Sequence, residues 1–208
     1  MFKHSVLAMT LLAILAYPGV GRGSVEVSAV GKLGFFLPLG DWYAHRYVDG
    51  VDQFQGSYVL CPEVEIKFSD IGISVLYSYA DLQTTEWEDF VNGQGENLYA
   101  SGSISQLGGV LAYYFVNTQR NCAYIEGGLC YVSLVGKEQF RGFNYDYDFL
   151  QSGLGYLAGA GYQFAFNRRL SLLLTARFLW EPEGIRYPEG KTYDVYGIYF
   201  LPGLKLTF

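Results

Sequence analysis

Hydrophobic and polar residues alternate along most of the chain after residue 24. In the C-terminal segment, Leu204, Leu206 and Phe208 share one parity, and Lys205 and Thr207 share the other. An alternation of period two places each set on its own face of a β-strand. The pattern recurs in eight segments, and the bulky apolar face carries no charge in any of them. Such faces are typical of strands that cross a membrane with one side toward lipid.

These segments predict an all-β fold, an eight-stranded antiparallel up-and-down transmembrane β-barrel. The predicted strands are 25–37, 57–69, 71–79, 99–116, 122–135, 153–166, 170–181 and 196–208. The connections 38–56, 82–97, 136–151 and 182–191 are long, whereas 69–70, 117–121 and 167–169 are tight. Outer-membrane barrels have long extracellular loops and short periplasmic turns, so we expect both termini in the periplasm. The first half of the fourth strand is polar, and we expect it to project beyond the lipid.

The composition favours spanning by strands rather than by helices. The chain of 208 residues contains 26 Gly, 19 Tyr and 15 Phe with only 16% charged residues. After the N-terminal segment, no stretch reaches the roughly 18 consecutive apolar residues that a membrane helix needs. A formal charge of −6 without a basic patch argues against nucleic acid as a partner.

The N-terminal segment has the form of a secretory signal peptide. Lys3 and His4 precede an apolar run, and small turn-forming residues follow it. We therefore predict a signal peptide at residues 1–23 and an outer-membrane β-barrel domain at residues 24–208.

Charged residues on the inward parity are nearly balanced in sign. An eight-stranded barrel has room for its own side chains or for one small ligand, so we predict a filled lumen in which these charges pair. A gated pore whose ion pairs exchange partners is the alternative. The predicted lumen charge network is Glu26, Lys32, Glu63, Glu65, Lys67, Glu126, Arg177, Glu181 and Lys205.

Glycines line one inward stretch of the sixth predicted strand. They remove side-chain volume from that wall of the lumen and leave space for Tyr124, Tyr199 or Arg177 from other strands. A ligand cavity is the alternative, although glycine also permits the coiling that barrel closure requires. The stripe is Gly153, Gly155, Gly159 and Gly161.

Two prolines and three cysteines carry further expectations. Pro62 and Pro202 each remove a ladder hydrogen bond, so we expect them at a bulge or a strand end. Cys122 and Cys130 are about 26 Å apart on one strand and cannot bond to each other. We interpret both, together with Cys61, as small buried side chains.

Catalytic chemistry has little support in the sequence. His45, in the first long loop, is the only histidine after the predicted signal peptide, and a single loop histidine most often serves no catalytic role. We predict no catalytic residue, no cofactor and no metal site. The long loops are acidic and aromatic, which fits partner binding, stacking within the loops, or contact with lipopolysaccharide through divalent cations.

Three motifs resemble one known family. They are Gly31 to Pro38 in the first strand, Gly108 to Phe115 before a tight turn, and Gly203 to Phe208 in the last strand. Together they resemble the small eight-stranded outer-membrane β-barrel superfamily that includes OmpA-, OmpX- and opacity-type proteins. The resemblance implies that Leu204, Leu206 and Phe208 form the signal read by the barrel assembly machinery.

The leading hypothesis is a monomeric, non-enzymatic barrel of the outer membrane. Its loops would have a structural, adhesion or surface-interaction role, with an extracellular protein or glycan as the ligand and with membrane lipid and lipopolysaccharide around the barrel. The alternatives are a narrow porin-like channel for small solutes and a lipid A-modifying enzyme that depends on His45.

Overall fold

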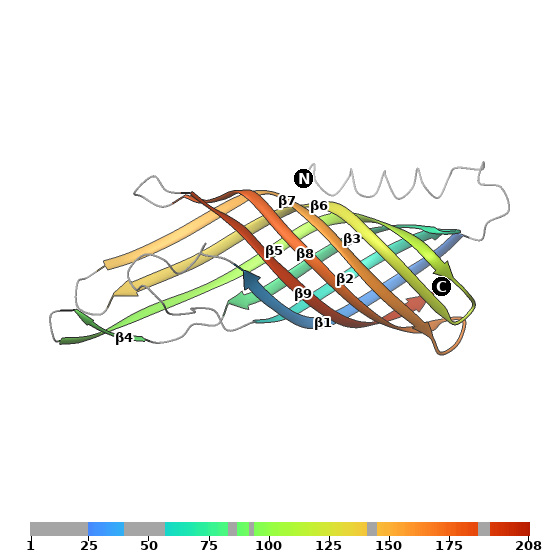
Figure 1. Ribbon diagram of the computed structural model, residues 1–208, viewed down its shortest axis with the longest axis horizontal. Coiled ribbons are helices and arrows are strands. Elements are labelled where there is room, and N and C mark those ends of the chain that lie inside the picture. The colour runs from blue at the N-terminus through green and yellow to red at the C-terminus, as the bar shows by residue number, and fades with distance from the viewer. Residues whose placement is uncertain (1–24, 40–56, 83–86, 92–93, 141–144, 187–191) are drawn as a thin grey trace.

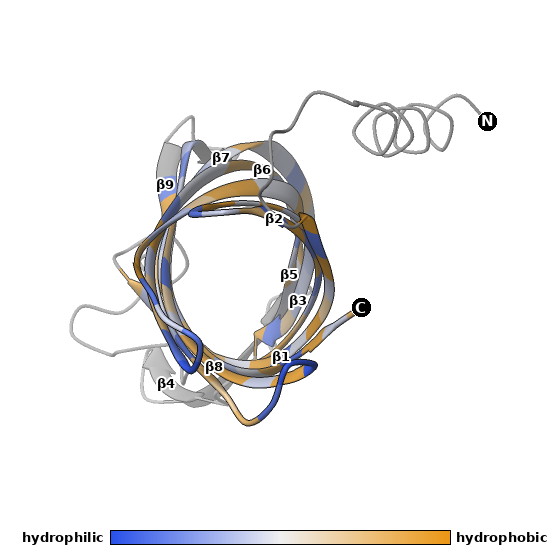
Figure 2. Ribbon diagram, turned by 90° about the vertical axis from the view of Figure 1, so that its right-hand side faces the viewer, coloured by the Kyte–Doolittle hydropathy of each residue, from blue (hydrophilic) through white to orange (hydrophobic). Residues whose placement is uncertain are grey.

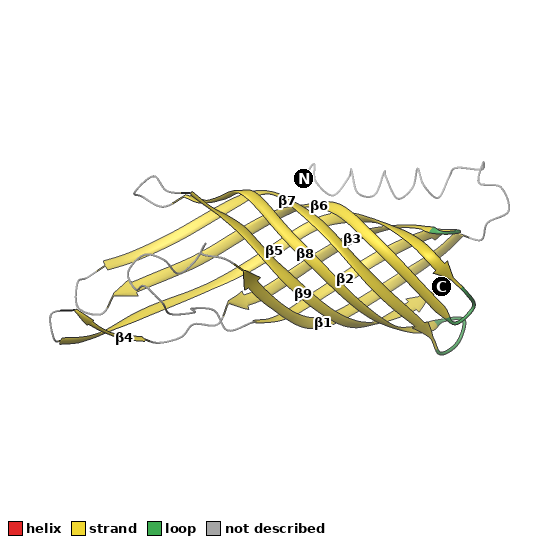
Figure 3. Cartoon of the chain, viewed as in Figure 1, coloured by secondary structure: helices red, strands yellow, loops and turns green. Residues whose placement is uncertain are grey.

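The computed structural model describes residues 25–39, 57–82, 87–91, 94–140, 145–186 and 192–208. The signal-peptide prediction and the interpretation of His45 lie outside these residues. Within them the chain is built of strands and tight turns (Figure 3). No helix in this part of the chain is long and apolar enough to cross a membrane.

In the described part of the chain, nine strands form one antiparallel sheet that closes on itself (Figure 1). Their order is β3-β2-β1-β9-β8-β7-β6-β5-β4, and a pairing of β3 with β5 completes the ring. Eight strands therefore make the barrel. The short β4 lies outside this ring and pairs only with the first residues of β5. The strands are β1 (Val25–Leu39), β2 (Ser57–Phe68), β3 (Ile71–Leu82), β4 (Trp87–Val91), β5 (Gln94–Asn117), β6 (Asn121–Phe140), β7 (Tyr145–Ala165), β8 (Leu170–Arg186) and β9 (Thr192–Thr207).

The predicted alternation is confirmed in the barrel wall. Along β3, every second residue from Ile71 to Asp81 is exposed and every residue between them is buried. Viewed along its axis, the barrel is a ring whose strands change hydropathy from residue to residue (Figure 2). The exposed positions carry the large apolar side chains, such as Leu33, Tyr58 and Leu107. The outer surface is thus the apolar one, as a lipid-facing wall requires.

The strands differ in length more than the sequence predicts. β5 begins at Gln94 rather than at residue 99, and β7 begins at Tyr145 rather than at residue 153. The predicted loop 136–151 is mostly strand, and β8 continues to Arg186 past the predicted end at residue 181. Beyond the lipid neither face of a strand has to be apolar, so backbone pairing continues where the hydrophobic alternation has ended.

The expectation for the two prolines is wrong. Pro62 lies inside β2 and Pro202 inside β9, and exposure still alternates on both sides of each. Pro62 pairs with Gly31 of β1, and Pro202 pairs with Leu174 of β8. Each proline is unpaired on one side only. Pro62 has no partner on β3, and Pro202 has no partner on β1. A proline whose nitrogen faces one neighbouring strand costs that strand one hydrogen bond and does not force a bulge.

Tight turns connect neighbouring strands at one end of the barrel, which is named the turn end. The opposite end is named the loop end. In the first turn Ser69 has a φ of 55°. The Asn117 side chain donates hydrogen bonds to the Asp70 carboxylate at 2.8 Å and to the Ser69 carbonyl at 3.2 Å. In the last turn Asn167 Oδ1 accepts from the backbone N–H groups of Arg169 and Leu170. These side chains hold the turns as Asx-type motifs do.

A filled lumen as the candidate functional site

Two layers of side chains fill the barrel. The charged layer consists of Lys32, Glu63, Glu65, Lys67, Glu126, Arg177 and Lys205, all buried. The apolar layer consists of Phe36, Val59, Cys61, Leu76, Ala80, Leu82, Ile104, Val110, Cys130, Val132, Leu134, Leu157, Leu179, Val195, Tyr199 and Leu201. On each strand with members of both layers, the apolar ones lie nearer the loop end.

Arg177 joins strands from different sides of the lumen. Its Nε lies 2.6 Å from Glu126 Oε1 on β6, and its Nη1 lies 3.0 Å from Glu63 Oε1 on β2. Lys32 on β1 completes the group, with its Nζ 2.9 Å from Glu63 Oε2. β8 is not adjacent to β2 or to β6 in the sheet, so the Arg177 side chain crosses the interior. Its Nη2 has no hydrogen-bond partner within the described residues.

A second group lies nearer the turn end around Glu65. Lys205 Nζ of β9 lies 2.5 Å from Glu65 Oε2, and the Tyr114 hydroxyl of β5 donates to Glu65 Oε1. Lys67 Nζ lies 4.1 Å from the centroid of the Tyr114 ring and donates to Asn117 Oδ1 at 2.9 Å. Three strands thus meet at one carboxylate, and a cation–π contact adds to the ion pair.

The predicted charge network is placed as follows. Six of its nine residues are joined by ion pairs, and Lys67 is bound to Asn117. Glu181 is buried on β8, nearer the loop end than Leu179. Glu26 is only half-buried near the start of β1, at the turn end, and is not part of either layer. The buried charged residues of the network are four acids and four bases, so the interior is formally neutral. A neutral set of this kind is what burial of charge requires, because an unpaired charge in the interior is costly.

The apolar layer was not predicted. Its centre is Tyr199, which is 2% exposed, stacks on Phe36 at a centroid distance of 4.4 Å and accepts a hydrogen bond from Gln106. The available signal was the uninterrupted apolar runs, such as residues 35–37 and 178–180, whose inward members Phe36 and Leu179 belong to this layer. A run without alternation indicates a strand with both faces covered.

The glycine stripe is filled by neighbouring side chains. A side chain at Gly161 would collide with the Tyr124 ring, one of the predicted fillers. Gly159 faces Glu126, and Gly155 faces Val132 and Cys130. The Tyr124 hydroxyl also bonds Thr175 Oγ1 at 2.7 Å. The space at Gly155, Gly159 and Gly161 is therefore taken mainly by Tyr124 and other residues of β6, and neither Tyr199 nor Arg177 is among the nearest neighbours.

The outer wall has hydrogen-bonded aromatic side chains near both ends of the barrel. Toward the loop end, Tyr79 bonds Asp81 at 2.7 Å, Tyr131 bonds Ser152 at 2.5 Å, and Trp180 bonds Asp194 at 3.2 Å. Toward the turn end, Tyr162 bonds Asn121 at 2.6 Å. Aromatic rings with a polar group favour the two membrane interfaces. These contacts mark the limits of the lipid-facing band.

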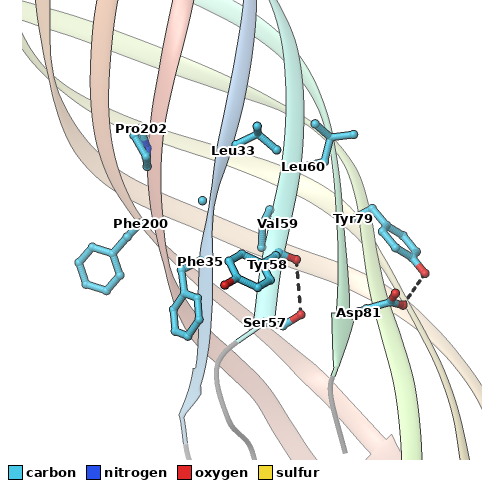
Figure 4. Close-up of a pocket in the computed structure, with 11 residues that line it drawn as sticks. Leu33, Phe35, Ser57, Tyr58, Val59, Leu60, Tyr79, Asp81, Phe200 and Pro202 are labelled. Carbon is cyan, nitrogen blue, oxygen red and sulfur yellow. Dashed lines mark hydrogen bonds between the residues drawn. The ribbon is translucent and has the colours of Figure 1, made fainter.

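A groove of about 790 Å³ lies on the outer wall across β1, β2, β3 and β9 (Figure 4). Its lining includes Leu33, Phe35, Phe200 and Pro202. A second groove adjoins it at Phe200 and Pro202 and continues over Ala160 and Ala176. Both grooves are apolar and lie in the lipid-facing band, so they belong to the membrane surface of the wall.

The barrel is similar to solved structures of outer-membrane proteins. Ail of Yersinia pestis, in complex with the heparin analogue sucrose octasulfate, matches with a TM-score of 0.54 at 13% identity, over 90% of this chain and 100% of Ail. A major outer membrane protein of Thermus thermophilus matches with a TM-score of 0.54 at 12% identity, over 89% and 100%. Neisserial surface protein A matches with a TM-score of 0.50 at 14% identity, over 88% and 96%.

The chain has the fold of the small outer-membrane β-barrels. By sequence, no family model and no curated protein matches it. These structural matches establish the fold of the barrel, while its place and activity have to be argued from the residues.

The remaining predicted residues of the barrel lie as follows. Leu204, Leu206 and Phe208 are exposed on the outer wall, and the Phe208 N–H donates to the Val27 carbonyl at 3.0 Å. Their role as an assembly signal stays a prediction. The three cysteines, Cys61, Cys122 and Cys130, are free and buried, as predicted. In the described part of the chain, no three His, Cys, Asp or Glu side chains come together as a metal site.

Proposed function

We propose that this outer-membrane barrel is a non-enzymatic, non-conducting and monomeric protein that acts through its loop end. The termini and tight turns lie in the periplasm, and the loop end faces the outside. Barrel assembly machinery inserts the chain, and lipid together with lipopolysaccharide surrounds the wall. An extracellular protein or glycan is bound beyond the membrane.

The filled lumen is the observation that carries this proposal. Arg177 crosses the interior to Glu63 and Glu126, and Lys205 crosses to Glu65. Toward the loop end the Phe36 and Tyr199 rings stack within a continuous apolar cluster. A solute would have to break buried ion pairs and then displace apolar packing, and both steps are costly. The barrel is therefore a rigid support rather than a conduit.

The charge of the chain indicates the kind of partner. Ail is in complex with a heparin analogue, which is a polyanion. A polyanion is held by clustered Lys and Arg, whereas this chain has a formal charge of −6, and its sequence between residues 86 and 97 contains four acids and no base. Opposite potentials favour association. A cationic partner, or lipopolysaccharide phosphate bridged by divalent cations, fits this loop end better than a sulfated glycan does.

Single-channel conductance of the refolded protein in a planar bilayer tests the closed lumen. We expect no openings from inserted protein, and brief openings only when Glu65→Gln or Arg177→Gln removes a buried charge. Discrete openings of the unsubstituted barrel would make it a channel and would refute the proposal. Insertion is verified by the different migration of heated and unheated protein on detergent gels.

Surface binding is tested with a barrel whose long loops are shortened. Cells that display the intact barrel should bind a cationic protein surface more strongly than cells that display the shortened one. Equal binding by both would remove the role assigned to the loop end. The enzymatic alternative predicts a changed lipid A mass spectrum on expression, and we expect no change.

A further inference from the structure

One stretch of β7 has a strand partner on one side only. β7 pairs with β6 over its whole length up to Phe164, from Tyr145 opposite Phe140 to Phe164 opposite Asn121. It pairs with β8 only from Tyr156 to Ala165. Within the described residues, the segment 145–155 therefore has an open edge, and it projects toward the loop end in Figure 1. This segment is named the β7 edge.

The sequence of β8 explains why the pairing stops. Trp180 pairs with Tyr156, and the same register would next bring Pro182 opposite Leu154 as a hydrogen-bonded pair. Proline has no N–H to donate. Immediately beyond, β8 shifts register against β9 between Glu181 and Ile185. β8 thus leaves β7 at the first position where its backbone cannot donate.

The direction of the free backbone groups follows from the register. The N–H of Ala165 donates to the Arg120 carbonyl, on the β6 side of the strand. N–H and C=O groups alternate in direction along a strand, and the β6–β7 register is continuous. Odd-numbered residues therefore bond β6, and even-numbered residues face away from it. Where the facing residues 181–186 of β8 are described, these free groups belong to Leu150, Ser152 and Leu154.

Several of the features that usually protect exposed strands are missing from this edge. Proteins block such edges with charged side chains, lysine above all, with proline or with a bulge. The segment 145–155 contains no lysine or proline, and its pairing with β6 has no register shift. Its only charged residues are Asp146 and Asp148, which repel an acidic strand and attract a basic one.

The segment begins next to Tyr156, which pairs with Trp180. The Trp180–Asp194 and Tyr131–Ser152 hydrogen bonds place this start at the membrane interface. From there the segment continues away from the lipid. The free groups therefore lie at the interface and on its water side.

We infer that the β7 edge is a docking site for an extended, basic segment of another protein, which adds to the sheet as a further strand. This inference rests on the proposed function and names its site. The described segments 145–155, 181–186 and 192–194, next to the opening, contain five Asp or Glu and one Lys or Arg. A second copy of the chain would oppose acid to acid in the segment 145–155, which has two aspartates and no base. Strand addition gives affinity through backbone hydrogen bonds, and charge selects the partner.

Amide hydrogen exchange in detergent micelles tests the inference with a ten-residue peptide of alternating Lys and Val. Bound peptide should slow exchange at residues 150, 152 and 154 at least tenfold. Residues 151 and 153, which already bond β6, should change little. A peptide of alternating Glu and Val is the matched probe and should leave all five unchanged. Even-numbered amides that are already protected without peptide would show that the edge is covered by the chain itself, and the inference would be wrong.

Proline substitution is a second test of strand addition. Leu154→Pro removes one free N–H without touching a β6–β7 hydrogen bond, and Leu154→Val keeps the N–H. One lost hydrogen bond with blocked pairing should weaken peptide binding about tenfold, while Leu154→Val should bind as the unsubstituted protein does. Leu150→Pro, at a residue that is 77% exposed, repeats the test at an independent position. Unchanged affinity in both proline variants would refute strand addition.

The cell-binding assay separates this inference from the proposed function. If Leu154→Pro cells keep the binding that loop-shortened cells lose, the loop end functions without the β7 edge and only the inference fails. If intact and loop-shortened cells bind equally, the proposed function fails as well. Heat-dependent gel migration verifies that each variant forms the barrel.

Discussion

The charged layer and the apolar layer of the lumen share five strands, β1, β2, β6, β8 and β9, but are stabilised by different forces. In the charged layer each group has named partners, such as Arg177 with Glu63 and Glu126. In the apolar layer Leu179 is fully buried among aliphatic side chains and depends on packing. Removal of one partner should be severe in the first layer, and loss of volume should dominate in the second. The inward face of this barrel is thus charged nearer the turn end and apolar nearer the loop end.

The largest effect is expected for Arg177→Met. The substitution leaves Glu63 with Lys32 alone and removes the cation paired with Glu126 in the interior. Breaking a buried pair from one side costs about 3–5 kcal/mol. Denaturant unfolding in lipid vesicles measures the free energy of unfolding. A loss below about 1 kcal/mol would mean that the charged layer contributes little to stability.

Leu179→Ala tests the apolar layer and should cost about 3 kcal/mol, since truncation of a buried leucine leaves a cavity. The matched control is Leu174→Ala on the same strand, where the side chain is 54% exposed on the outer wall. Lipid chains can fill the space outside, so we expect a smaller loss there. Equal losses in the same unfolding assay would indicate that the apolar layer is loosely packed.

Substitution of two buried tyrosines, one in each layer, compares the layers directly. Tyr114 donates its hydroxyl to the Glu65 carboxylate in the charged layer, and Tyr199 accepts from Gln106 in the apolar layer. Hydrogen bonds to charged groups contribute about 1.5–3 kcal/mol and neutral ones about 0.5–1.5 kcal/mol. Tyr114→Phe should therefore destabilise the barrel more than Tyr199→Phe does. The reverse order in vesicle unfolding would contradict the distinction between the layers.

Glu26→Gln should have the smallest effect. Glu26 is half-buried and lies outside both layers, although its parity is inward. Surface charge substitutions usually change stability by less than about 0.5 kcal/mol. A loss above about 1 kcal/mol in the vesicle assay would extend the charged layer to the end of the barrel.

The sequence predicted the barrel well and its interior only in part. Alternation is imposed by lipid on one side, so the eight strands and the outward positions of Leu204, Leu206 and Phe208 could be predicted. The arrangement of side chains in the lumen depends on packing between residues that are distant in sequence, such as Phe36 and Tyr199. No local pattern encodes that pairing. The extension of β7 to Tyr145 was missed for a related reason, because backbone pairing continues after the hydrophobic signal ends.

The seam between β1 and β9 has a consequence for how the protein folds. Ser28 and Thr207 share a hydrogen bond although they are separated by 179 positions in sequence. Ring closure must therefore wait until both extremes of the barrel sequence are available, and contacts of such high sequence separation form slowly. Until then the partly formed sheet has two open margins that are prone to aggregation. Closure by β9 should accordingly be the late, committing event, detectable as delayed heat resistance during refolding.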